Sequence, residues 1–113
     1  MAISFDAIGE RYVTFFAGQT AEDGKLCKMT ANGTVGNCAA NDDFCGVITQ
    51  VRGGTASVLM NGYVELPYTG SAPSLGYSVL VAGASDSVKS AESGKTYLVV
   101  NVDTTAKTVG LFL

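Results

Sequence analysis

The stretch that decides the fold is FCGVITQVRGGTASVLM, residues 44–60, because a second stretch of the same style, KTYLVVNVDTTAKTVGL, follows at residues 95–111. Each stretch has two runs of β-branched and apolar residues that flank a short loop. Such a pattern is typical of a β-hairpin. A glycine-led strand precedes each hairpin, at residues 24–29 and 76–81, so the chain carries an internal repeat at an offset near 51 residues.

Short apolar runs and turn residues alternate along most of the chain at intervals of about 8 to 12 residues, which is typical of a small β-sandwich or barrel. Asn32-Gly33 and Gly53-Gly54 supply the positive φ that tight hairpin turns require. We predict ten strands, at residues 11–17, 25–30, 34–39, 44–52, 55–61, 63–68, 77–82, 87–91, 95–103 and 108–113.

These strands predict an all-β fold, a small β-barrel or sandwich of two similar halves, at about residues 24–66 and 75–113, that bury their apolar faces on each other. Residues 1–20 fall outside the repeat, and we expect them to form an N-terminal arm beside a single β domain at residues 21–113. Within the strand at 95–103, alternation places Leu98, Val100 and Val102 on the core face.

The composition excludes several classes of function. The chain has 113 residues and no histidine, which removes the usual base at neutral pH and the commonest metal ligand. Ser-His-Asp and Cys-His catalysis are therefore excluded, and we expect a protein that is not an enzyme. Seven Lys and Arg residues are scattered singly and the net charge is −3, so we expect no nucleic-acid partner. The sequence contains no apolar run of membrane-spanning length and no apparent signal peptide, which predicts folding in the cytoplasm and no membrane partner.

The remaining chemical motifs are weak. Cys27, Cys38 and Cys45 are an odd number without a CxxC pair, so we predict buried free thiols, with no metal and no cofactor. Gly94-Lys95-Thr96 resembles the end of a phosphate-binding loop, but Lys89 stands where the signature needs a glycine. The acidic pairs at 22–23 and 42–43 lack the spacing of a calcium loop and are predicted to be solvated.

The aromatic residues offer two surfaces. Tyr63, Tyr68 and Tyr77 are close enough in sequence to suggest a carbohydrate-binding face, although tyrosines of this kind more often lie in a core or an interface. The run at 12–17, YVTFFA, is hydrophobic on both faces. It is predicted to pair with another chain or to cover a sheet edge.

The stretches GKLCKMTANGTV (24–35), FCGVI (44–48) and VLMNGYVELP (58–67) resemble the small capsid decoration, or capsid cement, proteins of tailed bacteriophages and prophages. Those proteins show a glycine-led strand, an Asn/Asp-Gly-Thr hairpin, a Gly-Val strand and a strand that ends in Gly-x-Val before Pro or Thr. The resemblance covers roughly residues 24–113 and is one of pattern and turn spacing.

The resemblance implies a structural virion protein, made in the bacterial host cytoplasm, that sits on the capsid exterior and stabilises the head. Its partners would be the major capsid protein of the same phage and further copies of itself, with a trimer favoured. In such proteins an N-terminal arm commonly reaches a neighbour, which here implies an interface of Ile3, Phe5, Tyr12, Phe15 and Phe16. The alternatives are a tail or baseplate subunit and a carbohydrate-binding module.

Overall fold

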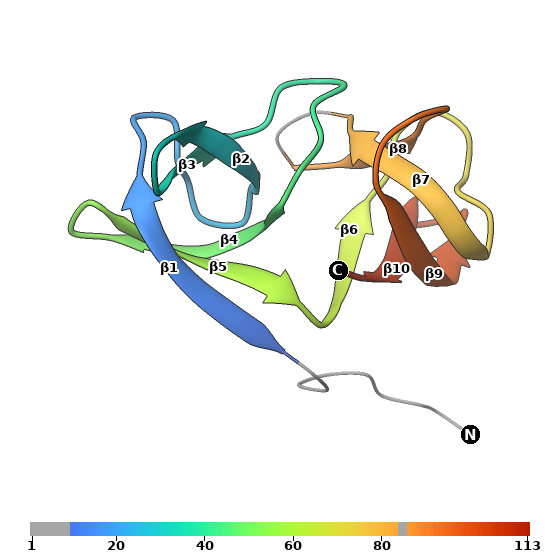
Figure 1. Ribbon diagram of the computed structural model, residues 1–113. Helices are drawn as coiled ribbons and strands as arrows, with labels where there is room; N and C mark the ends of the chain where they lie inside the picture. Colours follow the sequence, from blue (N-terminus) through green and yellow to red (C-terminus); the bar gives the residue numbers. More distant parts are fainter. Residues whose placement is uncertain (1–9, 84–85) are drawn as a thin grey trace.

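The computed structural model describes residues 10–83 and 86–113, and these form an all-β protein, as the sequence predicts. All ten predicted strands are present, with ends that differ by a few residues at most (Figure 1). Their bounds are β1 (Arg11–Ala17), β2 (Leu26–Ala31), β3 (Thr34–Asn37), β4 (Gly46–Arg52), β5 (Thr55–Asn61), β6 (Tyr63–Pro67), β7 (Gly76–Ala82), β8 (Val88–Ser90), β9 (Thr96–Asp103) and β10 (Thr108–Phe112).

The first five strands close into a barrel in the order β1-β3-β2-β4-β5. Strand β1 completes it, because it pairs antiparallel with β5 along its whole length and parallel with β3 at its end. Phe16 and Ala17 are the residues opposite Thr34 and Val35 in the parallel pair. A closed barrel leaves no unpaired edge strand, which is the usual liability of a small sheet.

The last five strands form a second sheet in the order β6-β10-β9-β7-β8, which lies beside the barrel in Figure 1. Read from β1 in the opposite direction, the closed barrel has the order β1-β5-β4-β2-β3. The second sheet repeats this order strand by strand, with β6 in the place of β1 and β8 in the place of β3. Each strand of the second half begins 50 to 54 residues after its counterpart. The internal repeat is therefore structural as well as sequential, and it covers five strands in each half.

The seam that closes the barrel also has a counterpart. In the first half the amide of Gly18 donates to the carbonyl of Val35 at 2.8 Å, beside the parallel β1–β3 pair. In the second half the amide of Thr69 donates to the carbonyl of Val88 at 2.9 Å, beside a parallel bridge between Tyr68 and Val88. The second sheet thus curls until its edge strands meet at one point.

This arrangement differs from the predicted N-terminal arm. Residues 11–17, assigned by sequence to an arm at 1–20 outside the repeat, form β1 and are the counterpart of β6. The reason is the pairing surface: β3 and β5 would both be open edges without β1 between them. Sequence comparison missed the match because RYVTFFA and YVELP share little beyond alternation.

Two apolar clusters hold the molecule together. The barrel interior contains Cys27, Val35, Ile48, Ala56 and Val58, with Phe15 packed against them. The larger cluster fills the second half and continues across the junction, where barrel residues Leu26, Phe44 and Val47 pack with Tyr97, Val99 and Leu111. The two halves therefore share the larger of the two clusters.

The face of β9 that meets this core differs from the prediction. Tyr97 and Val99 are buried, whereas Leu98 and Val100 are half-buried on the other face, and only Val102 of the predicted set packs against the core. The pairing of β10 with β9 shifts register between Gly110 and Leu111: Gly110 lies opposite Asn101 and Leu111 lies opposite Val99. Val100 therefore has no register partner on β10 and forms a bulge. Such a bulge reverses the side-chain alternation beyond it.

The connection between β3 and β4, residues 38–45, joins the halves. The amide of Asn41 donates to the carbonyl of Ala82 at 2.8 Å, and the amide of Ala82 donates to the carbonyl of Asp42 at 2.9 Å. The rings of Phe44 and Tyr97 stack with centroids 4.9 Å apart, and the Tyr97 hydroxyl donates to the Phe44 carbonyl at 3.0 Å.

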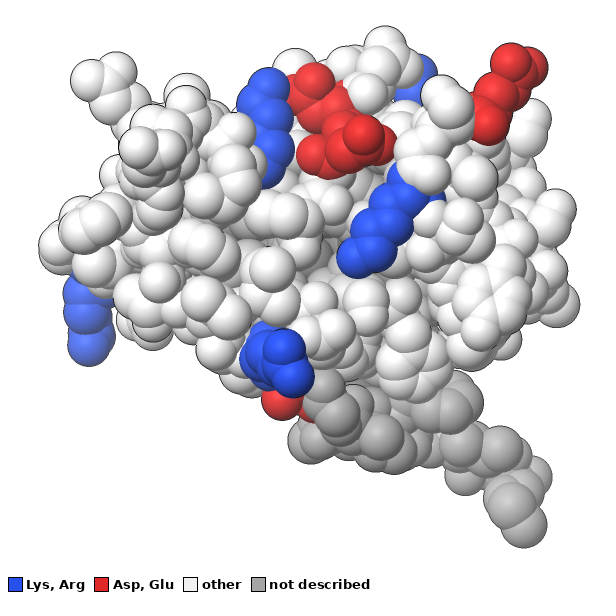
Figure 2. Space-filling view, viewed as in Figure 1, with Lys and Arg blue, Asp and Glu red and all other residues white. Residues whose placement is uncertain are grey.

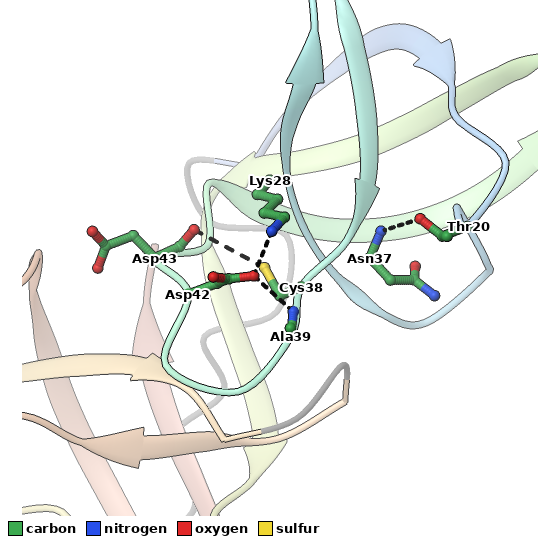
Figure 3. A network of polar contacts seen from close by, with 7 residues as sticks. All are labelled: Thr20, Lys28, Asn37, Cys38, Ala39, Asp42 and Asp43. Carbon is green, nitrogen blue, oxygen red and sulfur yellow. Dashed lines mark hydrogen bonds and ion pairs between the residues drawn. The ribbon is translucent and has the colours of Figure 1, made fainter.

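Polar contacts keep this connection in shape (Figure 3). The Asp42 carboxylate accepts hydrogen bonds from Lys28 Nζ at 2.6 Å and from the Ala39 amide at 2.8 Å. These contacts hold the pKa of Asp42 below its ordinary value, with the Lys28 bond as the larger cause, and they raise the pKa of Lys28. The Asn37 amide on the neighbouring strand donates to Thr20 Oγ1 at 3.2 Å.

Candidate binding surface

The outer face of β1 presents two large aromatic rings to solvent. Strand alternation directs Tyr12, Thr14 and Phe16 outward, and the side chains of Tyr12 and Phe16 are 51% and 66% exposed. Phe15 points the other way and packs against the barrel interior. Of the three predicted interface residues in β1, the structure therefore brings Tyr12 and Phe16 to the surface and assigns Phe15 to packing.

Phe16 lies on the seam of the barrel, opposite Thr34 of β3 and Thr55 of β5. Its backbone amide donates to the carbonyl of Gly33 at 2.8 Å, in the β2–β3 turn. Beside the ring is a shallow groove of about 260 Å³, which is lined by Thr14, Phe15, Phe16, Gly33 and Thr55. Gly33 has a φ of +62°, and a Cβ at this position would lie 3.7 Å from the Phe16 ring, so glycine suits both the turn and the ring beside it.

The groove beside Phe16 has no charged lining residue, and the nearest charge in its row is Arg52, which pairs with Thr55 on the far side of β5. The residues that line its groove are threonines, phenylalanines and a glycine. Figure 2 shows the face on which β1 lies in front: basic and acidic side chains adjoin each other near the top and at the lower centre, and broad uncharged surface lies between these places. At the other end of the strand the Tyr12 hydroxyl donates to Glu10 Oε1 at 3.1 Å, and this bond raises the pKa of Tyr12. The Phe16 end of β1 is thus apolar and the Tyr12 end is flanked by charge, and an apolar centre with a polar rim is the composition expected of a protein interface.

The other predicted residues have different positions. Ile3 and Phe5 lie outside the described residues. The three tyrosines of the carbohydrate alternative do not form a common exposed row, because Tyr68 points into the core and is 5% exposed. Tyr63 is half-buried and Tyr77 is 78% exposed on the outer face of the second sheet.

A second apolar surface was missed by sequence reasoning. Register partners Tyr77, Leu98, Phe112 and Tyr63 form a row across β7, β9, β10 and β6, and Leu75 beside it is 68% exposed. The rings of Tyr63 and Phe112 form a T-shaped pair, with centroids 5.6 Å apart. Sequence reasoning placed Leu98 in the core because it assumed regular alternation along residues 95–103. The bulge in β9 breaks that alternation and directs Leu98 outward, and the sequence gives no sign of the bulge.

Both residues of the acidic pair at 22–23, which the sequence predicts to be solvated, have hydrogen-bond partners in the fold. The Glu22 carboxylate accepts from Asn37 Nδ2 at 3.0 Å, and Asp23 Oδ1 accepts from the Val51 amide at 2.7 Å. Among residues 10–83 and 86–113, no group of three or more acidic or cysteine side chains has the geometry of a metal site. No helix in the same residues is long and apolar enough to cross a membrane.

Comparison of the chain with protein-family models, with curated proteins and with solved structures found no match.

Proposed function

We propose that this protein is a structural phage virion protein that binds the outside of the capsid and stabilises the head. The observation that carries the proposal is the exposure of Phe16 and Tyr12 on the closing strand of the barrel. A protein that binds other surfaces needs an exposed apolar patch on a rigid element, and β1 is held by pairing on both sides. The repeat pattern that resembles decoration proteins supports the same function.

The proposed partners are the major capsid protein of the same phage and further copies of this chain, with a trimer favoured. Binding would bury the outer face of β1 at a junction between capsid subunits. Each contact is small, and many copies around a shell would add their contributions, so that modest individual affinity is sufficient. The proposed mechanism thus needs no catalytic group and no cofactor.

Co-sedimentation of the purified protein with expanded heads, assembled from the major capsid protein of the same phage, tests this function. We expect Phe16→Ser to weaken head binding about tenfold or more, because an exposed aromatic anchor is lost from the interface. The matched control is Tyr77→Ser, which removes an even more exposed ring from the other half and should bind as the parent does.

Two results would reject this surface. The first is that the Phe16→Ser protein, folded as judged by its circular dichroism, binds heads as tightly as the parent chain. The second is that Tyr77→Ser weakens binding and Phe16→Ser does not, which would transfer the interface to the second sheet. Binding of the parent chain to tails and not to heads would favour the tail or baseplate alternative.

A further inference from the structure

Two of the three cysteines lie in contact with each other across neighbouring strands. Cys27 Sγ in β2 and Cys45 Sγ just before β4 are 3.7 Å apart. The Cys45 amide donates to the carbonyl of Cys27 at 2.8 Å, which keeps the two backbones side by side. A disulfide needs Cα atoms about 4.4–6.8 Å apart, and Cys27 is the register partner of Gly46, the residue next to Cys45.

The two thiols have different surroundings. Cys27 is fully buried in the barrel interior, and its thiol also lies 3.5 Å from the carbonyl of Gly46. Cys45 is only partly buried at the rim of the same cluster. The contact with Cys27 lowers the pKa of Cys45, and the positive charge of Lys95 acts in the same direction. The pKa of Cys27 is raised by the contact with Cys45 and by burial.

We propose that Cys27 and Cys45 form a thiol–disulfide exchange site, in which Cys45 reacts with small-molecule disulfides and Cys27 completes an internal disulfide. The inference does not depend on what the protein binds. Its basis is the contact between the two sulfur atoms together with the difference in their exposure.

The reaction has two balanced steps. The Cys45 thiolate attacks one sulfur of a small disulfide such as glutathione disulfide, which gives a mixed disulfide and releases one thiolate. Cys27 then loses its proton and attacks Cys45 Sγ, which forms the Cys27–Cys45 bond and releases the second small thiolate. The two protein sulfurs are oxidised by two electrons in all, and the small disulfide is reduced to two thiols.

The site spans the connection that joins the two halves. A Cys27–Cys45 bond would close a loop that contains β3 and Asn41, Asp42 and Phe44, the residues that contact the second half. Closing a loop of this length restricts the unfolded chain, so we expect the oxidised protein to melt about 10 °C higher than the reduced one.

Cys38 provides the internal control. It is buried, and its thiol lies 4.0 Å from the carbonyl of Asp43. Burial raises the pKa of Cys38 to about 12, with the Asp42 charge as a further cause, so its thiol stays protonated near neutral pH. Cys38 is therefore predicted to remain a free thiol under conditions that oxidise the other two.

The experiment treats the full reduced chain with glutathione disulfide and then blocks the remaining thiols with an alkylating agent. We expect the intact mass to show one internal disulfide and one alkylated cysteine. Cys38 and Cys45 lie on one tryptic peptide, residues 29–52, so the Cys38→Ala variant is needed to assign the bond. That variant should still link the peptide at 26–28 to the peptide at 29–52, and Cys45→Ala should not.

Three results would overturn the proposal. They are an internal disulfide that disappears in Cys38→Ala, a glutathione adduct that persists on Cys45 without release of the second thiol, and three alkylated cysteines after treatment. The wild-type chain alone distinguishes the last two from the expected result, so a variant that failed to fold would leave the test intact. A melting temperature that does not rise on oxidation would reject the predicted effect on the junction.

Discussion

At the scale of single residues, the stacked pair Phe44 and Tyr97 is the centre of the junction between the halves. The rings are nearly parallel, with an interplanar angle of 4°, and both side chains are buried. Phe44→Ala should lower the free energy of unfolding by about 3–5 kcal/mol, because it leaves a cavity in a shared core. Urea unfolding measures the change.

Phe16→Ala is the matched control for that substitution, because Phe16 is 66% exposed. It should change the free energy of unfolding by less than about 1 kcal/mol. Equal losses for the two phenylalanines would contradict the shared core.

The lowered pKa of Asp42 makes the stability of the folded protein depend on pH. Its pKa is lowered in the folded protein by Lys28 and by the Ala39 amide, so its stabilising contribution is present above the ordinary carboxyl pKa. That contribution is lost as pH falls through the lowered value. The melting temperature of Asp42→Asn should therefore be below that of the parent at about pH 7, and the gap should narrow at about pH 2. A gap that is the same at both pH values would contradict the role given to the carboxylate.

At the scale of elements, β1 is part of the barrel, so a truncation that tests an N-terminal arm has to end before this strand. Deleting residues 1–17 would remove a strand that pairs with both β3 and β5, so we expect the product to lose its cooperative thermal transition. Deleting residues 1–9 leaves every described strand in place, and the circular dichroism of the product should remain that of a β protein. A folded product of the longer deletion would show that the barrel does not need β1.

The sequence predicted the elements better than their partners. All ten strands could be located, because β-branched runs and turn residues such as Asn32-Gly33 are local signals. The pairing of β1 could not be predicted, because its partner strands, β3 and β5, follow 17 or more residues later in the chain. The face of Leu98 depended on a bulge, and the contact between Cys27 and Cys45 depended on strand register. For the candidate surface, alternation puts Phe15 and Phe16 on opposite faces of β1, but only the closed barrel shows that Phe15 is the one that turns inward.

At the scale of the whole molecule, the two halves repeat one topology, and the larger of the two apolar clusters extends across both of them. Leu26, Phe44 and Val47 of the barrel belong to the same cluster as Tyr97 and Leu111 of the second sheet. We expect residues 1–61 and 62–113 to remain unfolded when they are produced separately, because each half would expose its share of this cluster. Amide proton dispersion in NMR spectra of each half measures this, and a well-dispersed spectrum for either half would contradict a shared core.

The same molecule presents two exposed aromatic side chains, Tyr12 and Phe16, on a strand that is paired on both sides, and the proposed function is adhesion to a capsid at that strand. The most direct test is quantitative mass spectrometry of purified phage particles that have been separated into heads and tails. The proposal predicts that this chain is present in many copies and remains with the heads. Its absence from particles, or its recovery with the tails, would contradict the proposed function.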